Sequence, residues 1–349
     1  MREETQVCIV GGGLIGMLCA YEAAEVGLSV FLVDENFAGG GDHAASVLFQ
    51  YEANSVLKEL LEAGHQGWAA LAEAFDEPIG YHTNGVGFVA LTPEKAQALA
   101  NHAGDGFTFA QKPDEMANML GVSQVQENLH GVLYEEHGAH IFPTLLHETL
   151  RQQLVRKGVR VWGSDRVAEI VMNDGAVKGV KTAHDELVAE HTILCANAWT
   201  GKLMAQLGLK LPLRPARSHR LEVSVTGEIP NFPLVNRLPK GDVLIRPMRS
   251  GRLLMTYTGL MDQHQATWSK HVDGEMVNLM RQNVAHILPA FRHGKTIRTE
   301  TNTLAVTPDN RPYIGRVAAM DGLYVATGMN AETYAYSPAV AKALVALIQ

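Results

Sequence analysis

The order of apolar and polar positions at the start of the chain predicts a strand, a helix and a second strand. Residues 7–10 form an apolar run rich in β-branched residues, which is typical of a buried parallel strand. Apolar residues then recur at helical spacing over 14–26, and Gly27 stands where a helix C-cap glycine belongs. A second apolar run over 28–33 ends at Asp34. This is the order of a nucleotide-binding β–α–β unit.

The remaining pattern alternates between strands and helices until it changes after Pro212. We expect helices over 55–75, 93–102, 114–120, 144–157, 273–287 and 338–348, and strands over 85–91, 159–162, 167–171, 176–182, 191–196 and 322–328. Three short, partly alternating runs over 220–226, 242–246 and 252–258 indicate an antiparallel sheet. The predicted fold is mixed α/β, with a discontinuous Rossmann-type domain (1–79, 140–214 and 300–349) built on a mostly parallel sheet, and a substrate domain (80–139 and 215–299) built on an antiparallel sheet.

The turn between the first strand and the first helix carries glycines at the three spacings of a dinucleotide-binding turn. Gly11 permits the tight turn, Gly13 lets the backbone approach a pyrophosphate, and Gly16 lets the helix pack against the strand. The N–H groups at the start of the helix then face the phosphate charges. Asp34 is placed to accept hydrogen bonds from ribose hydroxyls. The unit predicts a dinucleotide cofactor but does not separate FAD from NAD.

Composition narrows the class of protein. A net charge of −8 gives no basic surface for nucleic acid. No apolar stretch reaches the roughly 20 residues that span a bilayer, and the polar residues 1–6 lead directly into the first strand, so we expect no signal peptide and a cytoplasmic protein. Cys8, Cys19 and Cys195 lie in apolar runs, which favours small buried side chains over disulfides. The 15 histidines show no metal-ligand spacing, and no metal is expected.

Several further motifs follow the glycine turn in a recognisable order. They lie at 194–200 (LCANAWT), 213–217 (LRPAR), 307–315 (TPDNRPYIG) and 322–328 (GLYVATG). Together with the glycine turn they resemble the D-amino-acid oxidase superfamily, in particular its glycine oxidase and monomeric sarcosine oxidase branch, over nearly the whole chain. The resemblance implies FAD, an amine or amino-acid substrate (glycine-like, sarcosine-like or larger), and O2 or another carrier as electron acceptor. It also implies that Asn302 replaces the flavin-linking cysteine of sarcosine oxidase, so that FAD is held non-covalently.

The glycine turn and the resemblance together imply a set of cofactor-binding residues. In the family, the loop after the last strand turns backbone N–H groups toward the flavin N1–C2=O edge, where they stabilise the charge of the reduced ring. The second strand and its following loop hold the ribose, and a valine lies near the adenine. The expected set is Gly11, Gly13, Leu14, Ile15, Gly16, Asp34, Glu35, Asp42, His43, Ala44, Val167, Ala196, Asn197, Trp199, Gly328, Met329, Asn330, Ala331, Glu332 and Thr333.

The sequence departs from the family at the positions that hold the substrate carboxylate. Leu304 stands where amino-acid oxidases place an arginine, and Ala335 stands where the sarcosine oxidase branch places a lysine. The oxygen-activating lysine of that branch falls at about Leu253. Another cation must therefore anchor a carboxylate, and an arginine does so with two hydrogen bonds. The candidates are Arg217, His219, Arg220, Arg246, Arg249 and Arg252, with Arg246 preferred because it precedes Pro247 in a strand that borders the pocket in relatives.

The expected catalytic set is Tyr257, Arg246, His43, His219 and Glu332. Tyr257 falls at the active-site histidine position of the sarcosine oxidase branch, and Glu332 is placed to attract a cationic amine. His43 resembles the flavin-carrying histidine of the dimethylglycine dehydrogenase group. Two alternatives stay open. A 2-hydroxy acid as substrate needs a base, which only His43 or His219 offers, and a flavin-binding subunit without turnover needs none.

Overall fold

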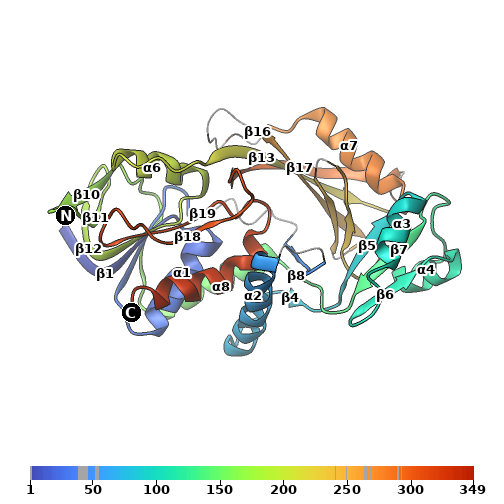
Figure 1. The fold of residues 1–349 in the computed structure, drawn as a ribbon, viewed down its shortest axis with the longest axis horizontal. Coiled ribbons are helices and arrows are strands. Elements are labelled where there is room, and N and C mark those ends of the chain that lie inside the picture. The colour runs from blue at the N-terminus through green and yellow to red at the C-terminus, as the bar shows by residue number, and fades with distance from the viewer. Residues whose placement is uncertain are drawn as a thin grey trace.

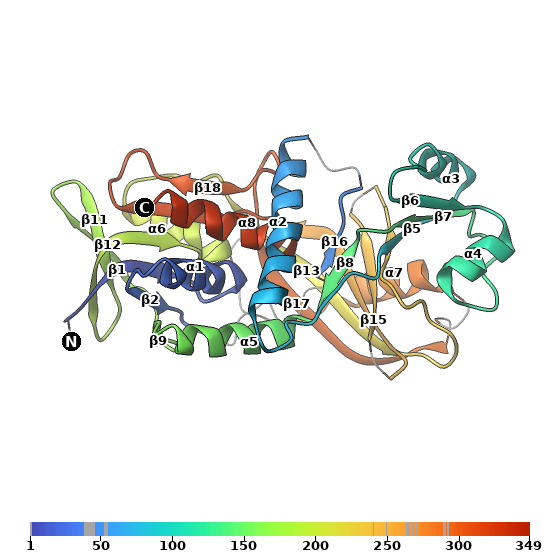
Figure 2. The same cartoon turned by 90° about the horizontal axis from the view of Figure 1, so that it is seen from below.

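The computed structural model describes residues 2–37, 46–51, 55–239, 241–248, 250–262, 266, 269, 271–288, 291 and 293–349. Two large sheets occupy opposite ends of an elongated molecule, and both chain ends lie at the end that carries the first sheet (Figure 1). Helix α2 (Ser55–Ala74) stands at the junction between these two halves in both views (Figure 2). The mixed α/β class expected from the sequence is confirmed; the exact domain limits stay predictions.

The first sheet has a parallel centre formed by the predicted apolar runs. Its strands, in order, are β10 (Glu169–Asn173), β11 (Ala176–Lys181), β12 (Glu186–Leu194), β1 (Arg2–Val10), β2 (Val30–Val33) and β9 (Arg160–Trp162), with β19 (Leu323–Thr327) beside β12 and β18 (Tyr313–Arg316) beside β19. Strand β1 pairs in parallel with both β2 and β12. The carboxyl ends of β1, β2, β12 and β19 therefore meet at one edge, where ligands of such sheets bind.

The second sheet is antiparallel except where β14 pairs with β5. Its order is β17 (Lys295–Val306), β13 (Arg214–Ser224), β16 (Arg252–Asp262), β15 (Val243–Met248), β14 (Leu234–Asn236), β5 (Val86–Ala90), β7 (Gly131–Glu135) and β6 (Phe107–Ala110). Strands β6, β7, β14 and β17 were not predicted, and β17 crosses the expected domain limit at residue 300. A small sheet of β3 (Val47–Leu48), β8 (Ala139–Ile141) and β4 (Tyr81–His82) lies between the two large ones.

The helices cover the sheets with their apolar faces. Besides α2, the described helices are α1 (Leu14–Glu25), α3 (Pro93–Ala100), α4 (Pro113–Leu120), α5 (Pro143–Arg156), α6 (Thr200–Gln206), α7 (Gly274–Ala285) and α8 (Thr333–Ala346). The 3-10 turn η2 covers Asn197–Trp199. Helix α7 packs on one face of the second sheet through an apolar core, which leaves the other face of that sheet toward the first domain. The three cysteines are buried and free, as predicted. None of the described helices is long and apolar enough to cross a membrane.

Helix α8 begins at Thr333, five residues before the predicted start at Pro338. A proline inside a helix removes one N–H donor and leaves the carbonyl four residues earlier without its usual partner. That carbonyl belongs to Tyr334, and it accepts a hydrogen bond of 2.7 Å from the indole Nε1–H of Trp68 on α2. The substitute donor allows the helix to extend through the proline, which brings its first turn to the sheet edge.

Replacing Trp68 by phenylalanine is expected to destabilise the folded protein by about 1–3 kcal/mol, because the buried Tyr334 carbonyl loses its donor. Chemical denaturation at saturating cofactor, followed by circular dichroism, measures the change. The matched control is Trp162→Phe, since no hydrogen bond from the Trp162 indole is found among the described residues. Equal losses for both variants would show that ring size, and not the bond to Tyr334, carries the effect.

Candidate functional site

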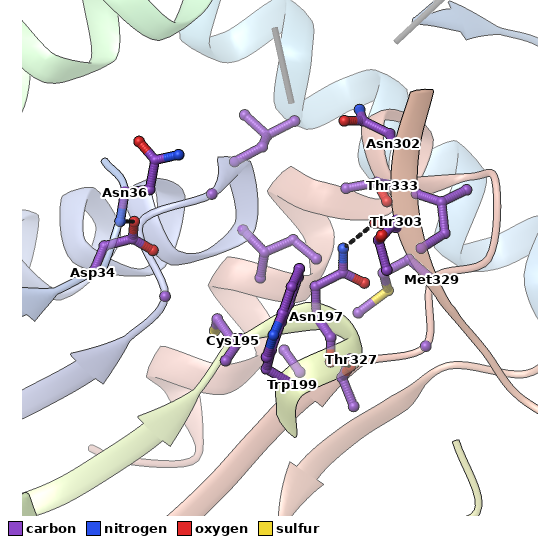
Figure 3. Close-up of a pocket in the computed structure, with 18 of the residues that line it drawn as sticks. Asp34, Asn36, Cys195, Asn197, Trp199, Asn302, Thr303, Thr327, Met329 and Thr333 are labelled. Atoms are coloured by element: carbon purple, nitrogen blue, oxygen red, sulfur yellow. Dashed lines mark hydrogen bonds between the residues drawn. The ribbon is translucent and has the colours of Figure 1, made fainter. Parts of the chain in front are cut away.

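A cavity of about 700 Å³ runs from the carboxyl edge of the first sheet to the inner face of the second. Asp34 and Asn36 lie on one side of it, Asn197 and Trp199 near its middle, and Asn302, Met329 and Thr333 on the other side (Figure 3). These residues come from the segment after β2, from η2, from β17, and from the loop before α8 and the first turn of that helix. The cavity lies within the usual range of ligand sites, roughly 300–1,000 Å³.

The glycine turn forms one wall of the cavity with the backbone that the sequence predicts. Gly11 has φ +109°, and a Cβ there would come within 2.5 Å of the Cys195 carbonyl oxygen. A Cβ on Gly16 would overlap the carbonyl oxygen of Gly11, so α1 packs on the turn only with glycine at that position. A Cβ on Gly13 would meet nothing within 4 Å, although Gly13 lines the cavity. The open space above Gly13 fits a pyrophosphate at the start of α1.

Asp34 is held rigidly at the end of β2. Its Oδ2 accepts a hydrogen bond of 2.6 Å from the Gly12 N–H, and its Oδ1 accepts one of 2.7 Å from the Asn36 N–H. Burial raises the pKa of the Asp34 carboxyl above its usual value, while these two N–H donors act in the opposite direction. The carboxylate lines the cavity close to the glycine turn, where it fits the ribose of a dinucleotide.

Asn197 joins the two sheets at the middle of the cavity. Its backbone is left-handed, with φ +47°, in a segment that resembles a family motif with glycine at this position. Asparagine tolerates this conformation better than most residues. The Asn197 Nδ2 donates to the carbonyl oxygen of Thr303 at 2.9 Å, and its Oδ1 accepts from the Ala305 N–H at 2.8 Å. The end of β12 is therefore fixed against β17.

The loop after β19 forms the wall opposite Asp34. Gly328 turns the chain with φ +73°, and residues 328–335 line the cavity up to the first turn of α8. Asn330 has φ +52°, and its Oδ1 accepts a hydrogen bond of 3.2 Å from the Thr307 N–H. The first N–H groups of a helix have no partners within it, so this turn presents donors to the cavity. The donor set fits the carbonyl edge of a flavin ring.

Most of the expected cofactor residues meet in this one cavity. Those that line it are Gly11, Gly13, Leu14, Ile15, Asp34, Glu35, Val167, Ala196, Asn197, Trp199, Gly328, Met329, Asn330, Ala331, Glu332 and Thr333. Gly16 does not line it and serves the packing of α1 instead. Asp42, His43 and Ala44 lie outside the described residues. Leu304 and Ala335, which we expect at the carboxylate-anchor positions of relatives, also line the cavity, as does Asn302.

The inner face of the second sheet supplies polar side chains that the sequence did not single out. Ser218, Thr256, Thr258 and Glu300 line the cavity, and Arg220 stands among them. The Arg220 guanidinium lies 3.2 Å from a Glu300 carboxylate oxygen, and 11% of its side chain is exposed. Burial lowers the pKa of Arg220 and the charge of Glu300 opposes this shift. Alternate residues of a strand point to the same face of the sheet, and Arg220 on β13 lies opposite Thr256 on β16. This alternation is the sequence signal that could have placed both side chains on the cavity face.

The same alternation places Tyr257 and His219 on the opposite face of the sheet. They face each other across β13 and β16, and neither lines the cavity. Tyr257 packs in the apolar core beneath α7. The pKa of His219 is lowered by burial. Neither side chain reaches the cavity from this face.

Arg246 does not line the cavity. It is 2% exposed, donates a hydrogen bond of 2.7 Å to the carbonyl oxygen of Ile141, and stacks on the Phe142 ring at 4.6 Å. Burial, together with the charge of Arg220, lowers the pKa of Arg246 to about 9.

The other candidate cations differ in whether they line the cavity. Arg217 and Arg252 do not line the cavity, and Arg252 pairs with Glu222 at 2.8 Å. Arg249 lies outside the described residues. Of the candidates within the described part of the chain, only Arg220 reaches the cavity.

Three features define a dinucleotide-dependent oxidoreductase with a separate substrate sheet. They are a β–α–β turn that is open to a pyrophosphate, a carboxylate placed for the ribose, and the start of α8, which faces the opposite end of the cavity. The family model described as DAO, FAD dependent oxidoreductase, matches residues 6–347. The chain therefore belongs to the DAO family of FAD-dependent oxidoreductases, and its cofactor is FAD.

Relatives of this chain act on amino acids and amines. It is 27% identical over 341 residues to a glycine oxidase of Pseudomonas putida, across 93% of this chain and 88% of that protein. It is 24% identical to the mitochondrial sarcosine dehydrogenase of Homo sapiens, across 93% of this chain and 37% of that protein. The glycine oxidase structure from Geobacillus kaustophilus has a TM-score of 0.87 at 24% identity, across 99% of this chain and 95% of that chain. The protein is an FAD-dependent oxidoreductase, and these relatives are named for the oxidation of glycine and the dehydrogenation of sarcosine.

Proposed function

We propose that this protein oxidises an amine that carries an acidic group, either a free or an N-substituted amino acid of the size of glycine or sarcosine or larger. FAD, when bound, accepts at flavin N5 the hydride that leaves the substrate carbon beside nitrogen. Water then converts the imine product to a carbonyl compound and an amine or ammonia. The observation that carries the proposal is the single cavity that joins the glycine turn and Asp34 to the side chain of Arg220.

The chain's own residues hold the cofactor and orient the substrate. Gly13 leaves room for the pyrophosphate, and Asp34 receives the ribose hydroxyls. The N–H groups of the loop from Met329 to Thr333, apart from the Glu332 N–H that donates to the Met329 carbonyl oxygen, stabilise negative charge at the far end of the flavin. We propose that FAD is held without a covalent bond, since Asn302 offers no thiol at the position where sarcosine oxidase uses one.

Arg220 is proposed as the anchor for the acidic group. Its guanidinium is held by Glu300, so it is oriented before substrate arrives. A charge-assisted bond from an arginine to a carboxylate is stronger in a mostly buried cavity than in water. Leu304 and Ala335 leave the two usual anchor positions apolar, so the acidic group would bind on β13 instead of on β17 or α8.

The test is anaerobic mixing of the yellow holoenzyme with glycine, sarcosine, larger amino acids, amines without an acidic group and 2-hydroxy acids. We expect acidic amines to bleach the visible flavin band, and hydroxy acids to leave it unchanged because no described histidine lines the cavity. Bleaching by hydroxy acids alone would reject the proposal in favour of hydroxy-acid oxidation. No bleaching by any amine would reject it outright. Admitting air afterwards separates O2 from another electron acceptor.

A further inference from the structure

Glu332 is an acidic side chain in the cavity wall opposite the substrate sheet. It is half-buried, precedes the first residue of α8, and lines the same cavity as Arg220. Within the described residues its carboxylate takes part in no hydrogen bond and no ion pair. Its oxygens keep some exposed surface. A carboxylate that is partly removed from bulk water and has no protein partner gains from a ligand that satisfies it.

The charged and titratable groups around Glu332 largely cancel. Arg237 and Asp242 act on it from the connection between β14 and β15, and they form an ion pair of 2.6 Å with each other. Tyr336 faces it from the next turn of α8, where burial and the charge of Glu332 raise the pKa of the phenol. Burial of the Glu332 carboxyl therefore dominates and raises its pKa to about 7.

We propose that Glu332 is a catalytic residue that receives the ammonium group of the substrate and takes one proton from it before oxidation. This inference rests on the proposed function, and it assigns the two charged ends of the substrate to two walls: the acidic group to Arg220 and the nitrogen to Glu332. An amino acid at neutral pH carries an ammonium group, whose nitrogen has no lone pair to support loss of hydride from the adjacent carbon. A proton acceptor in the cavity removes that obstacle.

The proton transfer balances within the cavity. One N–H bond of the ammonium group breaks, one O–H bond forms on the Glu332 carboxylate, and a neutral amine and a neutral carboxylic acid replace an ion pair. Two neutral groups cost less than two charges in a site of low polarity, so burial favours the transfer. After hydride loss the substrate carries a cationic imine, and Glu332 returns its proton to water when the product leaves. Efficient proton transfer near neutral pH needs an acceptor with a matching pKa.

The test compares Glu332→Gln with the wild-type holoenzyme, using the amine from the panel above that bleaches the flavin fastest. The ratio kred/Kd, where kred is the limiting rate of anaerobic bleaching, is measured from pH 5.5 to pH 10. In the wild type we expect this ratio to rise with pH up to about 7, where Glu332 loses its proton, and then to stay level. In Glu332→Gln the ratio kred/Kd should instead keep rising up to the pKa of the free substrate amine. At pH 7.5 it should be about 100-fold lower than in the wild type.

Two further variants separate this role from a structural one. Glu332→Asp keeps a carboxylate and should restore the rise near neutral pH, while Glu73→Gln removes an exposed carboxylate from α2 and should leave the profile unchanged. The inference would be overturned if kred/Kd of Glu332→Gln still rose near pH 7. It would also be overturned if kred/Kd of the wild type rose at the amine pKa of each substrate instead. Failure of the proposed function is distinct, because then no amine bleaches the wild-type enzyme.

Discussion

Replacing Gly13 by valine is expected to give a folded but colourless protein. The backbone at Gly13 has φ −71° and ψ −178°, which valine adopts without strain, and a Cβ there meets no protein atom within 4 Å. The added side chain instead fills the space in front of the first N–H groups of α1, where the pyrophosphate of FAD binds. We expect FAD affinity to fall by at least about 100-fold, close to 3 kcal/mol. Visible absorbance after desalting and titration of the apoprotein with FAD measure this loss.

Gly201→Val is the matched control, because Gly201 also has open space around an added Cβ but lies outside the cavity. It should retain FAD. The far-ultraviolet circular dichroism of the Gly13→Val apoprotein should equal that of the wild-type apoprotein. A yellow Gly13→Val protein with unchanged affinity would remove the glycine turn from the cofactor site. An unfolded one would show that Gly13 serves packing, as Gly16 does.

Replacing Arg220 by methionine should lower kcat/KM for acidic amines by at least about 100-fold. Loss of one charged partner in a mostly buried pair costs about 2–5 kcal/mol. Methionine keeps much of the side-chain length, and Glu300 retains its ion pair with Arg298, so the wall of the cavity is preserved. The loss should appear mainly in KM when the acidic group contributes equally to the ground state and the transition state. Steady-state kinetics with the best amino acid from the panel measures it.

Two comparisons show whether the acidic group is what Arg220 recognises. An amine that lacks the acidic group should lose far less activity than the amino acid does. Arg252→Met, on the neighbouring strand, removes an equal charge that pairs with Glu222 outside the cavity, and kcat/KM should change little. Equal losses on both kinds of amine in Arg220→Met would mean that Arg220 supports the sheet and that another group binds the acid.

The sequence could predict the cofactor-binding part of the cavity because the residues that determine it are close together in the chain. The turn needs glycine at 11, 13 and 16 for reasons of backbone space that span only six residues, and Asp34 follows from the end of the next strand. Helix α1 and the strands of the first sheet lie within two residues of most predicted limits, because apolar runs and capping glycines mark them. The loop from Gly328 to Thr333 was predicted through the resemblance to a family, and it lines the cavity.

The set of side chains in the substrate-binding part of the cavity depended on tertiary structure. Residues 219 and 220 are adjacent in sequence, as are residues 256 and 257. Adjacent residues of a strand point to opposite faces, and only the position of α7 decides which face is core. This places Arg220 and Thr256 in the cavity and Tyr257 and His219 on the other side. Arg246 was preferred from its neighbouring proline, but it packs on Phe142 and does not line the cavity.

The sequence by itself determined the class of fold and the dinucleotide-binding turn, because each is set by residue type at a fixed spacing. Only the tertiary structure decided where α8 begins, since the indole of Trp68, far away in the chain, replaces the hydrogen bond that Pro338 removes. It also decided which charged side chains share the cavity. Burial and facing partners come from elements distant in sequence, and no local pattern encodes them.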